Sequence, residues 1–300
     1  DPAAALEIYR QVLQEASADE EAISAVRRIA EESEDLRLLG AEILEPVLRA
    51  ANRHDDLVAV LELQLAATAD AFERGRTLVA IAQVHEDGRR DVVAAQAALL
   101  RAFEETPDNR AVRNDLERLS TAMAAGEGNS LAGFRAYADA LERKAADASD
   151  PDLGRELLVT LSRISEERLG DDVRAARALS RAAEDSGDLP ELLAALDRLY
   201  ERLGQPRELA DVLTRRIESF SASPTERADL RTRLAAVQIE SFGTRREGLS
   251  TLRTALEEVP EHVGAREALE ALLSDRQLFD EVADALEPVY RAQGDHAKLA

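Results

Sequence analysis

The stretch from Arg101 to Asn109 reads RAFEETPDN, and the stretch from Thr254 to His262 reads TALEEVPEH. Both contain, in the same order, a small residue, a large apolar residue, two acids, one further residue and a proline. A proline lacks the amide hydrogen that a helix interior needs, so each stretch is typical of a helix that ends in a turn. The recurrence predicts a chain built from repeated helical units.

These two stretches belong to a pattern that occurs four times. A small residue is followed after four positions by a large apolar residue, after three more by a compact apolar residue, and after five more by a residue that ends helices. Spacings of four and three place the first three on one side of a helix, where small side chains let a neighbouring helix approach closely. The copies are Ala5, Tyr9, Val12 and Ser17; Ala95, Leu99, Ala102 and Pro107; Ala175, Leu179, Ala182 and Gly187; and Gly248, Leu252, Ala255 and Pro260.

A second signal precedes each of the last three copies. It is an apolar triad that marks a further helix, joined by a short loop to the helix with the small residues. We therefore expect helical hairpins, each with a first helix that carries the triad and a second helix that carries the small residues. The triads are Ile81, Ala82 and Val84; Leu161, Ser162 and Ile164; and Leu234, Ala235 and Val237.

Several short motifs predict where helices begin and end. Ser223-Pro224-Thr225-Glu226 has the form of a capping box with proline at the first helical position. The pairs Gly170-Asp171, Gly187-Asp188 and Gly294-Asp295 have the form of a helix stop followed by an N-cap.

The longest internal match joins residues 36–57 to residues 278–299 without a gap, at an offset of 242. Both copies contain the sequence LEPV followed by RA, with the prolines at Pro46 and Pro288. A proline inside an apolar periodic stretch either kinks a helix or starts a new one. The pattern alone leaves both alternatives open.

Helix-forming Ala, Leu, Arg and Glu dominate the composition, and no sustained alternation of strand-forming residues occurs. We predict an all-α fold of about sixteen helices, stacked as antiparallel hairpins in a single solenoid over residues 1–300. The least regular stretch is AMAAGEGNS at residues 122–130, which is either a hinge or a longer surface turn. The first residue is Asp1, so we expect the chain to be a segment of a longer protein.

The repeats resemble those of the tetratricopeptide (TPR) family. Leu196, Tyr200 and Gly204 fit the first helix and turn of that family's hairpin, and Ala95 with its three spaced partners fits the second helix. The family's tryptophan is absent, and His85, Ser165 and Gln238 stand at tyrosine positions. The chain is most similar to long TPR-like proteins of GC-rich bacteria.

The resemblance implies a right-handed α-α superhelix that binds a protein or peptide on a concave face formed by the first helices. Mapped by spacing, the outward positions of these helices are the candidate partner-binding residues. The alternative for each of them is an ordinary solvated helix surface. They are Arg76, Gln83, Glu86, Glu156, Arg163, Glu166, Asp229 and Thr232.

The charge and the motifs exclude several other functions. The formal net charge is −22, which disfavours nucleic acid and anionic lipid and favours a partner with a basic face. No stretch is long and apolar enough for a membrane span. The chain has no cysteine, no phosphate-binding or nucleophile motif and four scattered histidines, so we predict no catalytic residues, no metal and no cofactor.

The leading interpretation is a protein-interaction scaffold without catalysis. The alternative is a regulatory module that binds a ligand or peptide within a larger signalling protein. Because terminal repeats of a solenoid need polar outer faces, we also expect the segment to self-associate through its ends or to fray there.

Overall fold

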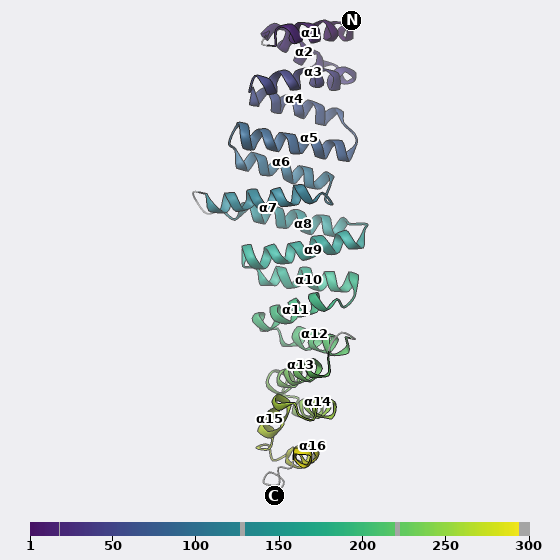
Figure 1. The fold of residues 1–300 in the computed structure, drawn as a ribbon, viewed down its shortest axis with the longest axis vertical. Helices are drawn as coiled ribbons and strands as arrows, with labels where there is room; N and C mark the ends of the chain where they lie inside the picture. Colours follow the sequence, from purple (N-terminus) through teal and green to yellow (C-terminus); the bar gives the residue numbers. More distant parts are fainter. Residues whose placement is uncertain (18, 127–129, 220–222, 294–300) are drawn as a thin grey trace. The chain divides into compact units, whose positions relative to one another are not determined.

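The computed structural model describes residues 1–17, 19–126, 130–219 and 223–293 of the chain. These residues form sixteen α-helices and no β-strand (Figure 1). The prediction of an all-α, repeat-type fold with about sixteen helices is confirmed. Contacts divide the chain into two compact units, one of residues 1–149 with 167–169 and the other of residues 150–166 with 170–300. That residues 1–300 form a single solenoid stays a prediction.

In the first unit, eight helices follow one another, and each lies beside the next (Figure 1). The most extensive packing is between α5 and α6 and between α3 and α4, which form tight antiparallel hairpins. The helices are α1 (Pro2–Glu15), α2 (Glu20–Glu32), α3 (Arg37–Ala50), α4 (His54–Ala67), α5 (Ala71–Gln83), α6 (Val92–Glu105), α7 (Arg110–Ala125) and α8 (Ala132–Asp147), with a 3-10 turn, η1 (Glu34–Leu36), before α3.

The second unit repeats this arrangement, with its tightest hairpins formed by α9 with α10 and by α13 with α14. Its helices are α9 (Pro151–Ile164), α10 (Asp172–Ser186), α11 (Pro190–Leu203), α12 (Pro206–Glu218), α13 (Pro224–Ala236), α14 (Arg245–Glu258), α15 (Val263–Leu272) and α16 (Phe279–Gln293).

Three hairpins share one kind of turn. A short π-helical segment extends the first helix: η2 (Val84–Gly88) after α5, η3 (Ser165–Leu169) after α9 and η4 (Val237–Ser241) after α13. In each, a carbonyl of the segment accepts a hydrogen bond of 2.8 Å from the N-cap residue of the second helix. The bonds run from Asp91 to His85, from Asp171 to Ser165 and from Thr244 to Gln238, so the three supposed tyrosine positions are the three carbonyl acceptors.

The prolines that the sequence left ambiguous lie inside helices, Pro46 in α3 and Pro288 in α16. The predicted capping box is confirmed at its N-cap, where the hydroxyl of Ser223 accepts from the amide of Glu226 at 3.1 Å. Asp171 caps α10 as predicted.

The prediction for Asp188 is wrong, because Leu189 is the N-cap of α11. Proline at the first helical position fixes where that helix begins, one residue later than the glycine and aspartate indicated. The Asp188 carboxylate instead accepts a hydrogen bond of 2.9 Å from Nε of Arg215. The third predicted pair, Gly294-Asp295, lies outside the described residues.

The small residues pack the helices together as their spacing predicted. Ala95, Ala102, Ala175, Ala182 and Ala255 are fully buried. At the buried Gly248 an added Cβ would lie 2.5 Å from a side-chain carbon of Ile239, so the close approach of η4 to α14 requires glycine. In the first copy Ala5, Tyr9 and Val12 are only partly buried.

The irregular stretch at residues 122–130 joins α7 to α8. Ala122 to Ala125 form the last turn of α7, which ends with a bond of 3.1 Å from the amide of Gly126 to the carbonyl of Ala122. Residues 127–129 lie outside the described part of the chain, so the choice between a hinge and a surface turn stays a prediction.

Candidate protein-interaction surface

The first helices of the hairpins carry all the candidate residues that the sequence indicated. In the first unit, Arg76 and Gln83 are exposed on α5, and Glu86 is half-buried in η2. In the second unit, half-buried Glu156 and Arg163 lie on α9, Glu166 in η3, and Asp229 and Thr232 on α13.

The structure places two of these residues in one groove. Arg76 and Gln83 line a groove of about 290 Å³ between α5 and α7. Its walls combine apolar and polar groups: Phe72, Gly75, Val79 and Ala80 from α5, Thr106 and Asn109 from the turn before α7, and Ala111, Val112 and Asp115 from α7. Gly75 lets this turn approach α5, since an added Cβ would lie 3.0 Å from the Thr106 hydroxyl.

Phe72 is the most unusual side chain of the groove. It is 61% exposed, although burial of an aromatic ring stabilises a protein. Beside it, Arg76 makes an ion pair of 3.0 Å with Glu73, and both side chains are more than half exposed. Such an exposed pair contributes little to stability, so a ligand could replace it at little cost, and both side chains are accessible.

Glu86 has a structural role that the sequence did not indicate. Its carboxylate pairs with both terminal nitrogens of Arg118 on α7, one contact measuring 2.8 Å. This hydrogen bonding lowers the pKa of Glu86 against the opposing effect of burial. The pair joins one first helix to the next within the first unit.

The second unit repeats this bond 80 residues later. Glu166 pairs with Arg198 at 3.0 Å and with Arg202 at 2.8 Å, both on α11. The bond from Arg198 is the main cause of the lowered pKa of Glu166. Two predicted partner-binding acids are therefore engaged in joining neighbouring first helices.

Asp229 and Thr232 also form hydrogen bonds within the chain. The Asp229 carboxylate lies 2.8 Å from Nε2 of His262, which is the N-cap residue of α15. The other ring nitrogen, Nδ1, accepts from the amide of Ala265 at 3.0 Å, so Nε2 carries the hydrogen and donates to Asp229. The Thr232 hydroxyl donates to the carbonyl of Ala228 in its own helix at 2.8 Å.

The sequence reasoning missed one buried acid. Asp197 on α11 is 3% exposed, and it accepts bonds of 2.6 and 2.7 Å from Arg233 on α13 and a further bond from Arg216 on α12. These bonds raise the pKa of Arg233. A signal was present, because Asp197 lies between Leu196 and Leu199, two residues of the buried side of α11. The arrangement connects three helices.

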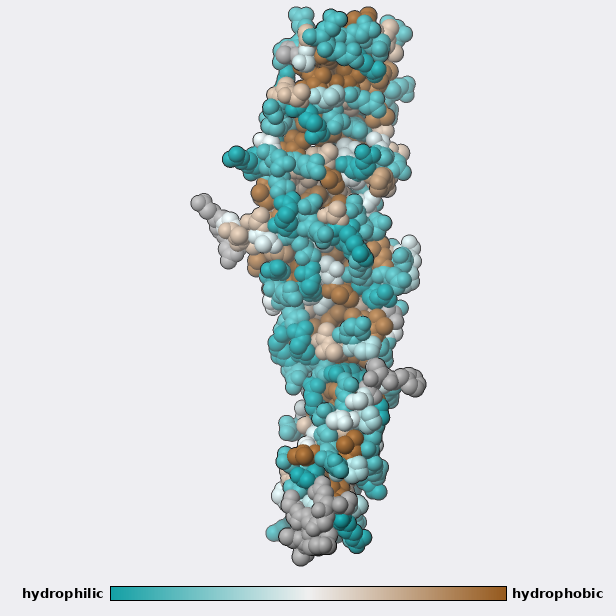
Figure 2. All heavy atoms as spheres, viewed as in Figure 1, coloured by the Kyte–Doolittle hydropathy of each residue, from teal (hydrophilic) through white to brown (hydrophobic). Residues whose placement is uncertain are grey.

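Neither a metal site nor a membrane-spanning helix is found among the described residues. Across residues 1–17, 19–126, 130–219 and 223–293, no three His, Cys, Asp or Glu side chains lie close enough together to hold a metal ion. Burial and the neighbouring Arg89 lower the pKa of His85. In the same part of the chain, no helix combines the length and apolar character that crossing a lipid bilayer requires. On the face drawn in Figure 2, hydrophilic residues cover much of the surface, and hydrophobic residues form patches among them.

No protein-family model matches the chain, and no curated protein does. Solved structures of TPR proteins are similar to it. The TPR2AB domain of yeast Sti1, in complex with pHSP90, is 15% identical over 90% of this chain and 97% of that one, with a TM-score of 0.30. A thermophilic TPR protein of Thermus thermophilus is 19% identical over 66% of this chain and 99% of that one, with a TM-score of 0.28.

A third structure, PilF of Pseudomonas aeruginosa, is 12% identical over 81% of this chain and 99% of that one, with a TM-score of 0.32. At these sequence identities and TM-scores, the similarity does not indicate what the chain binds. The TPR-like fold rests on the chain's own features, namely the repeated hairpins, the buried small residues of their second helices and the three equivalent turns.

Proposed function

We propose that the chain is a protein-interaction scaffold without catalytic activity, and that it binds an extended segment of a partner protein along its first helices. The observation that carries this proposal is the groove between α5 and α7, where exposed Phe72 lies beside Arg76 and Gln83. A large exposed aromatic next to polar groups is typical of protein-binding surfaces.

The groove suits a partner segment that offers both apolar and polar side chains. Phe72 and Val79 supply apolar surface, while Arg76 and Asp115 supply one charge of each sign. Because the chain has a net charge of −22, a partner with a basic surface around the bound segment would associate faster than a neutral one. We propose that nucleic acid is not a ligand, for the same electrostatic reason.

The test is site-specific photo-crosslinking in the source cell, with the photoreactive residue at position 72 and, as a control, at position 93. Phe72 is 61% exposed and Val93 is 62% exposed, but they lie on a first and a second helix respectively. The expected result is a discrete protein adduct from position 72 that position 93 does not give. In the purified complex, Phe72→Ala should weaken binding about tenfold or more, as truncation of an aromatic anchor does.

Equal adducts from both positions, or binding unaffected by Phe72→Ala, would refute the proposal. The alternative of a regulatory ligand-binding module predicts a different result, in which a small molecule raises the unfolding temperature and no protein is captured.

A further inference from the structure

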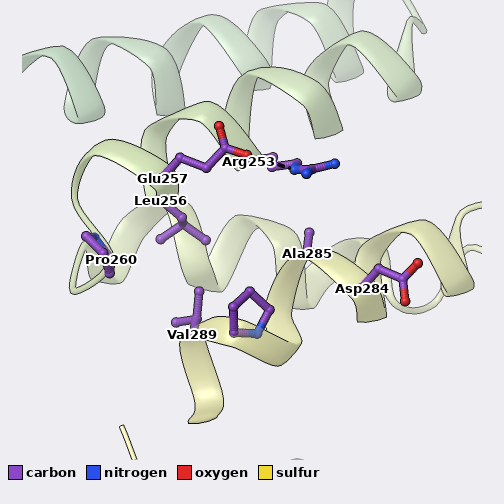
Figure 3. Close-up of a pocket in the computed structure, with 8 residues that line it drawn as sticks. Arg253, Leu256, Glu257, Pro260, Asp284, Ala285 and Val289 are labelled. Atoms are coloured by element: carbon purple, nitrogen blue, oxygen red, sulfur yellow. Dashed lines mark hydrogen bonds and ion pairs between the residues drawn. The ribbon is translucent and has the colours of Figure 1, made fainter. Parts of the chain in front are cut away.

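A second pocket lies within the second unit. It is formed by α14 and α16 in the second unit and has a volume of about 270 Å³. Leu256 of α14 and Val289 of α16 point toward one another across it, and Ala285 points into the same space (Figure 3). Pro260 and Pro288 complete its apolar lining. The pocket is smaller than most sites for drug-sized molecules, which measure about 300–1,000 Å³, and it suits an inserted side chain.

The internal repeat indicates which side chain fits. At the offset of 242, Ala285 and Val289 of α16 correspond to Ile43 and Val47 of α3. Ile43 is 6% exposed, whereas Ala285 is only partly buried. The position that is a partly buried alanine in α16 is therefore a buried branched aliphatic residue in α3.

The charged residues that line the pocket are Arg253, Glu257 and Asp284, which leaves one acid uncompensated. The helix α16 contains four acids, Asp280, Glu281, Asp284 and Glu287, against one arginine, Arg291. Asp284 lines the pocket, and it has no ion-pair partner among the residues that the structure describes. On α14, the charge of Arg253 is offset by Glu257, which lies 3.0 Å away. Two other acids of α16 are paired, Glu281 with Arg246 at 3.4 Å and Glu287 with Arg291 at 2.6 Å. A ligand at this pocket therefore meets one carboxylate, that of Asp284, whose charge no described residue of the lining offsets.

We propose that the pocket between α14 and α16 is a docking site for a basic amphipathic helix of a partner protein, which inserts one isoleucine or leucine beside Ala285 and places a lysine or arginine against Asp284. Burial of the aliphatic side chain supplies affinity. The carboxylate of Asp284 supplies orientation, and the net charge of −22 on the chain supplies a faster association that salt weakens. This surface is separate from the groove of the first helices, so the two proposals succeed or fail independently.

The probe is a fluorescein-labelled helical peptide about four turns long, with a central isoleucine flanked by lysines and arginines. Its binding to the 300-residue chain is followed by fluorescence anisotropy. We expect saturable binding that weakens about tenfold or more when the peptide isoleucine is replaced by alanine, because that side chain fills the pocket. Binding should also weaken as salt is added.

Two variants of the chain locate the binding. Ala285→Ile introduces the side chain that α3 carries at the equivalent position, and it should fill the pocket and weaken binding at least about tenfold. Asp284→Lys should weaken binding by charge repulsion without changing the core. The matched controls are Ala97→Ile on α6 and Glu267→Lys on α15, both at exposed positions, and neither should change the affinity. Phe72→Ala should leave peptide binding unchanged as well.

Absence of saturable binding would overturn the proposal. It would also be overturned if the alanine peptide bound as tightly as the isoleucine peptide, which would indicate attraction by charge alone. If Ala285→Ile disturbs the helical circular dichroism, Asp284→Lys against Glu267→Lys decides the question, and equal affinities of those two variants would contradict the docking site.

Discussion

Three turns with the same backbone differ in how well their sequences fit it. Arg90, Gly170 and Gly243 occupy equivalent places, each directly before the N-cap residue of a second helix, with φ of 54°, 64° and 70°. A left-handed backbone costs a residue with a Cβ roughly 1–2 kcal/mol, whereas glycine adopts it readily. Replacing Arg90 by glycine should therefore stabilise the first of these hairpins.

The magnitude follows from two opposing contributions. Relief of the backbone strain gives about 1–2 kcal/mol, and the greater freedom of glycine in the unfolded chain takes back about 0.5–1 kcal/mol. The net gain expected for Arg90→Gly is about 0.5–1 kcal/mol. In the opposite direction, Gly170→Ala should cost about 1 kcal/mol. No side chain or backbone atom lies within 4 Å of a Cβ added at Gly170, so only the backbone conformation contributes to that cost.

Hydrogen exchange of the α5–α6 amides is the suitable assay, because repeat proteins open locally and their global unfolding is not always two-state. Arg90→Gly should slow exchange in this hairpin about two- to fivefold, which corresponds to the expected free energy. Arg90→Ala is the control, since it removes the guanidinium and keeps the Cβ. An equal gain from Arg90→Ala, or no cost from Gly170→Ala, would refute the reasoning.

Three further predictions concern side chains that form hydrogen bonds between helices or cap a helix. Asp197→Ala should lower the free energy of unfolding by roughly 1.5–3 kcal/mol, as expected for lost bonds between charged groups, whereas Asp211→Ala, at an exposed position, should change it by at most about 0.5 kcal/mol in denaturant titrations. The partners of Glu166 lower its pKa in the folded state, so the ionised group stabilises the fold above the usual glutamate pKa of about 4.3, and this stabilisation is lost as the pH falls through the lowered value. Glu166→Gln should therefore lower the free energy of unfolding by up to about 1 kcal/mol at neutral pH. The free energy of unfolding of this variant should also fall less between neutral and acidic pH. His262→Ala should cost about 1 kcal/mol of stability through loss of the N-cap acceptor, while His262→Asn should keep it, as Asn109 does at the start of α7; equal thermal shifts for the two variants would contradict the assigned ring orientation.

Features that depend on neighbouring residues in the chain could be predicted from the sequence. The buried alanines at 95, 102, 175 and 182 follow from spacings within one helix, and the Ser223 cap follows from a motif of four residues. Where two local signals competed, the prediction failed: glycine and aspartate favoured Asp188 as the N-cap, but the proline at 190 set the start of the helix.

Features that depend on stacking could not be predicted in the same way. Arg118 and Glu86 are 32 residues apart, and only the packing of α5 and its extension against α7 brings them together. The sequence therefore identified positions on the first helices, of which Arg76, Gln83 and Asp229 are exposed, but not which of them are already paired. Gln83 and Arg76 line a groove, while Glu86, Glu166 and Asp229 have partners on the next first helix.

The π-helical turns also bear on how such a chain changes over evolutionary time. The segments VHEDG, SEERL and VQIES share no residue at any position in all three, yet each closes its hairpin with the same main-chain bond. Since a carbonyl is present whatever the side chain, substitutions can accumulate there without opening the hairpin. A chain joined in this manner can drift until its sequence matches no family model while its backbone stays recognisable.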